Sequence, residues 1–182
     1  MRSKMRVLAA ALVAVSVALL AAQEKPTEPG KDQLLKAARE VMAAARYCAF
    51  ITVGEDAHPQ ARIMDPFEPE ADMTVWLATN PATRKVAEVR RDPRVTLLYF
   101  DSKGPAYVTL VGRASVVDDA AEKAKRWKEE WAQFYRDGNR GADYLLLRVA
   151  PRRLEIVSYP HGILNDPENW RPRSLVLAPD GN

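Results

Sequence analysis

Residues 77–85, Leu77-Ala78-Thr79-Asn80-Pro81-Ala82-Thr83-Arg84-Lys85, are the most informative segment of the chain. An apolar run ends at Thr79, the turn-forming pair Asn80-Pro81 follows, and a segment with helical character comes next. Asparagine is favoured as the N-cap of a helix and proline at its first position. The stretch therefore predicts a strand, a tight turn and a helix that starts at Asn80-Pro81.

The same stretch concentrates groups that bind anions. A helix N-terminus presents unpaired backbone N–H groups and a partial positive charge, and Thr79, Asn80 and Thr83 add hydroxyl and amide donors. Arg84 and Lys85 add two cations, which the helix dipole disfavours by a few tenths to about 1 kcal/mol each. No acidic residue in the first turn balances them. Either the pair binds a phosphate, or both side chains point into solvent, where screening makes the penalty small.

Arg62 is the second candidate for phosphate binding. It lies in the strand segment Ala61–Asp65, where alternation places Arg62 and Met64 on one face and Ile63 on the other. A guanidinium group binds phosphate through two parallel hydrogen bonds. An arginine in the middle of a strand can equally lie on a solvent-exposed face, and the residues alone leave both interpretations open.

The remaining pattern predicts a mainly β (α+β) protein with flanking helices. Apolar spacing predicts one helix over residues 34–45 and another, rich in tryptophan, over residues 118–136. The expected strands are 47–53, 60–64, 73–79, 95–100, 106–117, 144–149 and 154–159. Six to seven short strands with few helices predict a β-barrel. The tryptophans of 118–136 are expected to contact the core or a second copy of the chain.

The N-terminal segment is typical of a secretory signal peptide. Three cations precede an apolar run that ends at Ala22, shorter than the roughly 20 residues of a membrane-spanning helix. We expect residues 1–22 to be the signal peptide, 23–31 a linker, 32–160 the folded domain and 161–182 a C-terminal tail. The protein is then exported to the periplasm or the extracellular space. An uncleaved segment, which would anchor it in the membrane, is the alternative.

Charge and cysteine content exclude other function classes. The whole chain carries a formal net charge of +3, and Arg2, Lys4 and Arg6 of the predicted signal peptide account for it (+3 − 3 = 0 in the mature chain). Nucleic-acid binding is therefore not expected. Cys48 is the only cysteine and the chain has two histidines, so neither an intramolecular disulfide nor a metal site is expected.

Five segments in order resemble the pyridoxamine 5′-phosphate oxidase-like split β-barrels, and within them the general stress protein group. The segments are Ala-Arg-Ile-Met (61–64), Trp-Leu-Ala-Thr-Asn (76–80), Thr-Arg-Lys (83–85), Asp-Pro-Arg-Val-Thr-Leu-Leu-Tyr-Phe (92–100) and Tyr-Val-Thr-Leu-Val-Gly-Arg-Ala (107–114). The resemblance covers about residues 31–159. It implies a split barrel that binds flavin mononucleotide (FMN) at the interface of a homodimer.

The resemblance also implies which residues contact the cofactor. Arg62, Ile63 and Met64 match the strand that holds the flavin phosphate and lies along the isoalloxazine ring. The matching residues after it are Ala78 and Thr79 at the end of the next strand and Thr83, Arg84 and Lys85 at the helix start. No catalytic residue is indicated.

Departures from the family pattern argue against vitamin B6 synthesis. Phe67 replaces a substrate-binding lysine, Tyr107 replaces a glutamine, and Val157 lies where a tryptophan is expected. We expect a flavin-dependent oxidoreductase that acts on a small molecule, because the flavin itself supplies the redox chemistry. The alternatives are a stress protein that binds flavin without turnover and a split barrel that uses haem or a deazaflavin.

Overall fold

The computed structural model describes residues 28–178 of the chain. The predicted signal peptide, residues 1–22, and most of the predicted linker lie outside this range. Within the described range, no helix has the length and apolar character needed to cross a membrane.

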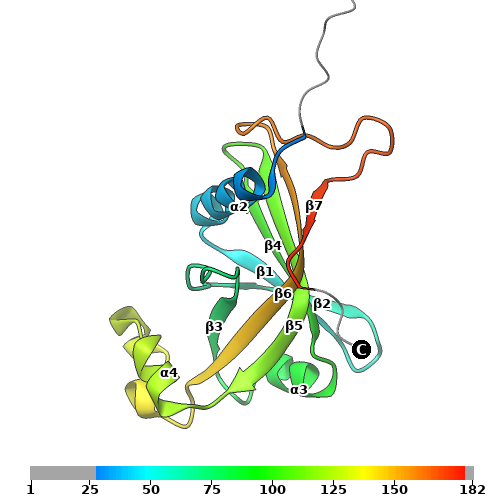
Figure 1. Ribbon diagram of the computed structural model, residues 1–182. Coiled ribbons are helices and arrows are strands. Elements are labelled where there is room, and N and C mark those ends of the chain that lie inside the picture. Colours follow the sequence, from blue (N-terminus) through cyan, green and yellow to red (C-terminus); the bar gives the residue numbers. More distant parts are fainter. Residues whose placement is uncertain (1–27, 179–182) are drawn as a thin grey trace, which may run out of the picture. The chain divides into compact units, whose positions relative to one another are not determined.

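Up to β5, the helices and strands follow the order expected from the sequence, with differences at several ends. The elements are α2 (Lys31–Ala45), β1 (Cys48–Val53), β2 (Pro59–Met64), β3 (Val75–Thr79), α3 (Arg84–Arg91), β4 (Arg94–Asp101), β5 (Ala106–Val117), α4 (Ala120–Lys125), the 3-10 helices η1 (Glu129–Gln133) and η2 (Gly138–Arg140), β6 (Leu145–Ser158) and β7 (Arg173–Val176). Figure 1 shows the long strands β5 and β6 crossing the molecule, with α2 near one end and α3 near the other.

The strands form a split β-barrel, as predicted. The sheet has the order β2-β1-β4-β5-β6-β3, every pairing is antiparallel, and β7 pairs with β6. Strands β2 and β3 are at the two ends of this order, and the segment that follows β2 connects them, because Pro66 forms an isolated bridge with Leu77 of β3. The backbone N–H of Phe67 also donates to the carbonyl of Trp76 at 2.9 Å. This link places the end of β2 next to β3 and helix α3.

Strand β6 is a single strand of 14 residues, whereas the sequence predicted two strands, 144–149 and 154–159. Pro151, which cannot donate to a β ladder, lies between these two predicted strands. The structure places Pro151 opposite Gly112 at a register shift between Val111 and Gly112. The bulge therefore accommodates the proline, and β6 continues through it.

Gly112 is required for this close approach of β5 and β6. A Cβ atom at this position would lie 2.3 Å from the carbonyl oxygen of Ala150. Gly112→Ala is therefore expected to lower the free energy of unfolding by about 1–3 kcal/mol, the usual cost of overpacking. Urea unfolding measures the change, with Ser115→Ala at an exposed position of the same strand as the control. Equal stability of the two variants would contradict the proposed clash.

The single helix predicted over 118–136 is wrong. The structure has α4, which ends at Lys125, followed by two short 3-10 helices. The hydroxyl of buried Tyr144 donates to the carbonyl of Arg126, and Trp127, Trp131 and Tyr135 all pack edge-on or tilted against the Tyr144 ring. The aromatic side chains thus surround Tyr144 instead of forming one straight stripe. They make a second small core within the chain.

The segment predicted as a C-terminal tail, 161–182, contains strand β7. Its residues pair with β6 from Arg153 to Ile156, and Leu175 packs against the main core. The short apolar pattern of β7 lies between polar and proline-rich segments, so the sequence alone favoured an unpaired extension.

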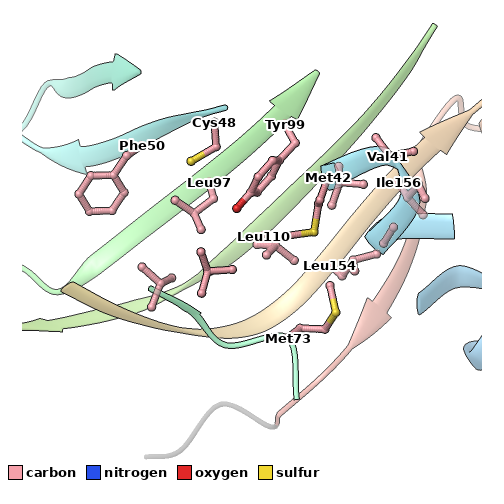
Figure 2. Packing of buried hydrophobic residues seen from close by; sticks show 14 of the residues in the cluster. Val41, Met42, Cys48, Phe50, Met73, Leu97, Tyr99, Leu110, Leu154 and Ile156 are labelled. Atoms are coloured by element: carbon pink, nitrogen blue, oxygen red, sulfur yellow. The ribbon is translucent and has the colours of Figure 1, made fainter. Parts of the chain in front are cut away.

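The main core lies between α2 and the inner face of the sheet. Figure 2 shows Val41 and Met42 of α2 facing Leu110 of β5 and Leu154 and Ile156 of β6. This matches the apolar helix face predicted from the spacing of residues 34–45. Helix α2 therefore covers the main core, whereas α3 follows the end of β3 elsewhere in the domain.

Cys48 belongs to this core rather than to a reactive site. Its side chain is buried and has no disulfide partner, and burial raises the pKa of the thiol to about 12. The thiol therefore remains protonated and unreactive at neutral pH. Across the described range 28–178, no group of three or more histidine, cysteine or acidic side chains is placed to hold a metal ion.

Candidate functional site

The turn between β3 and α3 is held by Asn80. Its side-chain oxygen accepts a hydrogen bond from the N–H of Ala82 at 2.9 Å, and its carbonyl oxygen accepts from the hydroxyl of Thr83 at 2.7 Å. Helix α3 then begins at Arg84 with Thr83 as N-cap, three residues later than predicted. Pro81 belongs to the turn, because the Asn80 side chain closes the turn locally before the helix starts.

The hydroxyl of Thr83 does not cap the helix. It lies 3.1 Å from the hydroxyl of Thr79, the last residue of β3. The ammonium group of Lys85 donates to the same Thr79 oxygen at 3.1 Å. The structure therefore brings two hydroxyl groups and one cation together at the uncapped N-terminus of α3, which is the arrangement predicted for a phosphate site.

Lys85 lies in an environment that disfavours its charge. The side chain is half-buried, and burial together with the nearby positive charge of Arg62 lowers its pKa, while Glu88 acts in the opposite direction. Among the residues described by the structure, no carboxylate lies within ion-pair distance of Lys85. An anion bound here would remove the imbalance.

The Arg62 side chain is held by hydrogen bonds to residues of strand β1 and helix α3. It pairs with Phe50 of β1 and faces the same side of the sheet as the core. The Nη1 group donates to the Thr52 hydroxyl at 2.5 Å, and Nη2 donates to Oε2 of Glu88 at 2.8 Å. The predicted alternation is confirmed, because Arg62 and its neighbour Met64 are half-buried and Ile63 is 70% exposed.

Glu88 is the functional residue that the sequence reasoning missed. Its side chain is only 3% exposed, and Oε1 lies 3.1 Å from Nε of Arg84. The Thr52 hydroxyl donates to its Oε2 at 2.6 Å. Burial raises the pKa of Glu88, but hydrogen bonds from Thr52 and Arg62 and the charges of both arginines outweigh burial and lower it. The spacing of Arg84 and Glu88, four residues apart on a helix, was the available signal.

The predicted cofactor residues fall into two groups in the structure. Five of them are connected by hydrogen bonds and ion pairs in two sets: Arg62 and Arg84 contact Glu88, and Thr83 and Lys85 contact Thr79. The charges of Arg62 and Glu88 act on Lys85, so the two sets lie close together. Ile63 lies on the outer face of the sheet, Met64 packs against the main core, and Ala78 packs against the aromatic core. Among the described residues, no hydrogen bond or ion pair joins these three side chains to Glu88 or Thr79.

A cavity of about 470 Å³ lies beside the segment that follows β2, and Asp65, the residue after Met64, is part of its wall. Its wall includes Asp65, Phe67 and Lys128, together with one face of α2. The Lys128 ammonium donates to Asp65 Oδ2 at 3.1 Å and lies 5.0 Å from the centre of the Phe67 ring. The acidic loop 68–72 borders this cavity and is fastened to α2 by Arg39, which donates to three of its carbonyl oxygens.

Known proteins resemble this chain in sequence and in fold. The family model of pyridoxamine 5′-phosphate oxidase matches residues 34–158. General stress protein 26 of Bacillus subtilis is 27% identical over 103 residues, which cover 55% of this chain and 71% of that protein.

Two solved structures extend the likeness. A protein related to general stress protein 26 from Clostridium acetobutylicum superposes with a TM-score of 0.67 at 20% identity, covering 81% of this chain and 96% of the other. General stress protein 26 from Bacillus anthracis has a TM-score of 0.56 at 21% identity and covers 65% of this chain and 92% of the other. At these identities the two structures show the fold alone. Because the family model spans most of the described residues, the chain belongs to the pyridoxamine 5′-phosphate oxidase family of split barrels.

Proposed function

We propose that this protein binds FMN through its phosphate at the start of α3 and acts as an exported, flavin-dependent oxidoreductase on a small molecule. The observation that carries the proposal is Lys85. Its half-buried ammonium has a threonine hydroxyl as its described hydrogen-bond partner and no described carboxylate in ion-pair range. A buried cation without a counter-ion is costly, and a phosphate at this helix N-terminus supplies the missing charge.

The surrounding residues fit a phosphate. Lys85 and Arg84 provide positive charge, and the backbone N–H groups of the uncapped first turn point outward from the helix. The Thr79 hydroxyl, which accepts from Lys85, can donate its own proton to an anion, and the Thr83 hydroxyl, which donates to the Asn80 carbonyl, can turn toward an anion. FMN bound here would supply the redox chemistry, while the protein positions it and limits access of water. The cavity beside Phe67 offers space for a small substrate.

We further propose that two copies assemble through the outer face of the sheet. Residues paired across neighbouring strands lie on the same face, so the register defines this surface. Its members are mostly apolar: Ala61 and Ile63 of β2, Ala49 and Ile51 of β1, Thr96, Leu98 and Phe100 of β4, and Tyr107, Thr109 and Val111 of β5. Ile63 and Phe100 are 70% and 62% exposed in the single chain. An apolar surface of this extent is typical of an interface.

Titration with FMN and riboflavin tests the proposed cofactor. The wild-type protein is expected to bind FMN about 100-fold or more tightly than riboflavin, because riboflavin lacks the phosphate and its charge-assisted hydrogen bonds. Protein purified from its own envelope fraction should show a flavin spectrum. A Soret band would show that the cofactor is haem, and a deazaflavin spectrum that it is a deazaflavin, instead of FMN. Reoxidation of the bound flavin during turnover with NAD(P)H then separates an enzyme from a non-catalytic binder.

The preference for FMN is expected to fall at alkaline pH. Burial lowers the pKa of Lys85 below its ordinary value of 10.5, and a bound phosphate raises it again by stabilising the ammonium. FMN affinity therefore decreases as the pH rises through the Lys85 pKa of the free protein, where the ammonium loses its proton. Riboflavin titrated over the same range corrects for ionisation of the flavin ring. A ratio of the two affinities that stays constant up to pH 10.5 would remove Lys85 from the site.

A further inference from the structure

Glu88 lies where three elements meet behind the proposed phosphate site. Thr52 comes from β1, Arg62 from β2 and Arg84 from α3, and the Glu88 carboxylate contacts all three. The side chain is almost fully buried. The carboxylate is thus an internal anion among cations that the proposed function assigns to the flavin phosphate.

A carboxylate at this place has an electrostatic cost for phosphate binding, because two anions close together repel each other. It also has a geometric effect. The Nη1 group of Arg62 is bonded to Thr52 and one Nη2 hydrogen to Glu88, so the plane of the guanidinium is fixed. A guanidinium carries five N–H donors. Nε–H and the second Nη2 hydrogen have no acceptor among the hydrogen bonds of the described residues, and they remain for a ligand.

We propose that Glu88 is a positioning residue of the phosphate site, which fixes the guanidinium groups of Arg62 and Arg84 and does not itself touch the ligand. The inference rests on the proposed FMN binding. Without Glu88, Arg62 and Arg84 repel each other and lose their common anchor. Arg62 keeps its hydrogen bond to Thr52 and Arg84 its hydrogen bond to Gln60, but each guanidinium is held at one point fewer, and ordering it on ligand binding costs entropy.

The test compares Glu88→Ala, Glu88→Gln and Thr52→Val with wild type. The quantity measured is the phosphate preference, defined as the dissociation constant for riboflavin divided by that for FMN. Glu88→Ala is expected to lower it about tenfold, the loss of roughly one charge-assisted hydrogen bond. Glu88→Gln keeps an acceptor for Arg62 and is expected to retain most of the preference. Thr52→Val removes one partner of both Glu88 and Arg62 and is expected to give an intermediate value.

Each outcome decides between distinct roles. An unchanged preference in folded Glu88→Ala would assign Glu88 to stability alone and overturn the proposal. A preference that rises in both Glu88 variants would mean that Glu88 only repels the phosphate, which also overturns it. A fall in Glu88→Ala with retention in Glu88→Gln supports positioning through the hydrogen bond to Arg62, and a fall in both variants supports positioning that also needs the charge of the carboxylate. If Glu88→Ala does not fold, Thr52→Val decides, because an unchanged preference there contradicts the shared anchor.

The proposed function fails in a different way. If wild type binds FMN and riboflavin equally, there is no phosphate site, and Glu88 has nothing to position. If wild type prefers FMN strongly and the variants do not change that preference, only the role of Glu88 is lost. Thermal melting of each ligand-free variant reports the structural contribution separately from the binding measurement.

Discussion

Lys85→Met is expected to weaken FMN binding about 10- to 100-fold and to leave riboflavin binding unchanged. A hydrogen bond to a charged group contributes about 1.5–3 kcal/mol, and each 1.4 kcal/mol is a factor of ten in affinity. Methionine keeps most of the aliphatic stem of lysine, so packing around Thr79 is largely retained while the charge is lost. Fluorescence titration with both flavins measures the two dissociation constants.

Arg90→Met is the matched control for this experiment. Arg90 lies on the same helix and is exposed, and the substitution changes the net charge of the protein by the same amount. It lies in the last turn of α3, about 9 Å along the axis from Arg84 at 1.5 Å per residue. An equal loss of FMN affinity in the two variants would show a general effect of charge instead of a specific site.

The stability of the ligand-free protein provides a second and independent signature. Lys85 is half-buried beside Arg62 and near the positive end of the helix dipole. Removing its charge is therefore expected to leave the melting temperature unchanged or slightly higher. Arg84→Met should behave differently, because Arg84 faces the buried carboxylate of Glu88 at 3.1 Å and its loss leaves that charge with one partner fewer. A clear destabilisation by Lys85→Met would instead indicate a structural ion pair.

Local sequence rules were sufficient for the strand, turn and helix around residues 77–85. Apolar runs, a turn pair and helix spacing act over a few residues, so the order of elements up to β5 was predicted correctly. The start of α3 was placed at Asn80 instead of Arg84, because Asn80 closes a turn of its own. Asparagine is favoured both as a helix N-cap and in turns. The sequence does not show which of the two roles Asn80 takes, because the choice depends on the backbone geometry of the folded chain.

The errors elsewhere come from contacts between distant segments. Two strands were predicted over 144–149 and 154–159, but a bulge in β6, opposite the step from Val111 to Gly112, lets one strand continue through both. A single helix was predicted over 118–136, but α4 ends just before Arg126, whose carbonyl oxygen accepts a hydrogen bond from the distant Tyr144 hydroxyl. Glu88 was overlooked for the same reason, since its partners Thr52 and Arg62 lie 36 and 26 positions earlier. Each of these depends on the sheet register, which only the folded chain defines.

The second large effect concerns assembly, and it is expected from Leu98→Glu. Leu98 lies between Ala49 and Thr109 in the centre of the outer face of the sheet. In a symmetric dimer each copy would bury one new carboxylate, and the cost of several kcal/mol per buried ion corresponds to at least a 100-fold weaker dimer. The half-buried position tolerates a carboxylate in the single chain, where it remains in contact with water.

Light scattering at micromolar concentration is the measurement for Leu98→Glu, with and without FMN. Wild type should have the mass of two copies and Leu98→Glu that of one, with circular dichroism unchanged. Ala124→Glu, at an exposed position of α4 outside the sheet, should remain dimeric. Because the family resemblance implies FMN at the interface of two copies, the monomeric variant should also bind FMN more weakly than wild type. A wild-type monomer in both states would contradict the dimer, and a dimeric Leu98→Glu would place the interface on another surface. A monomeric variant with full FMN affinity would confine the flavin site to one chain.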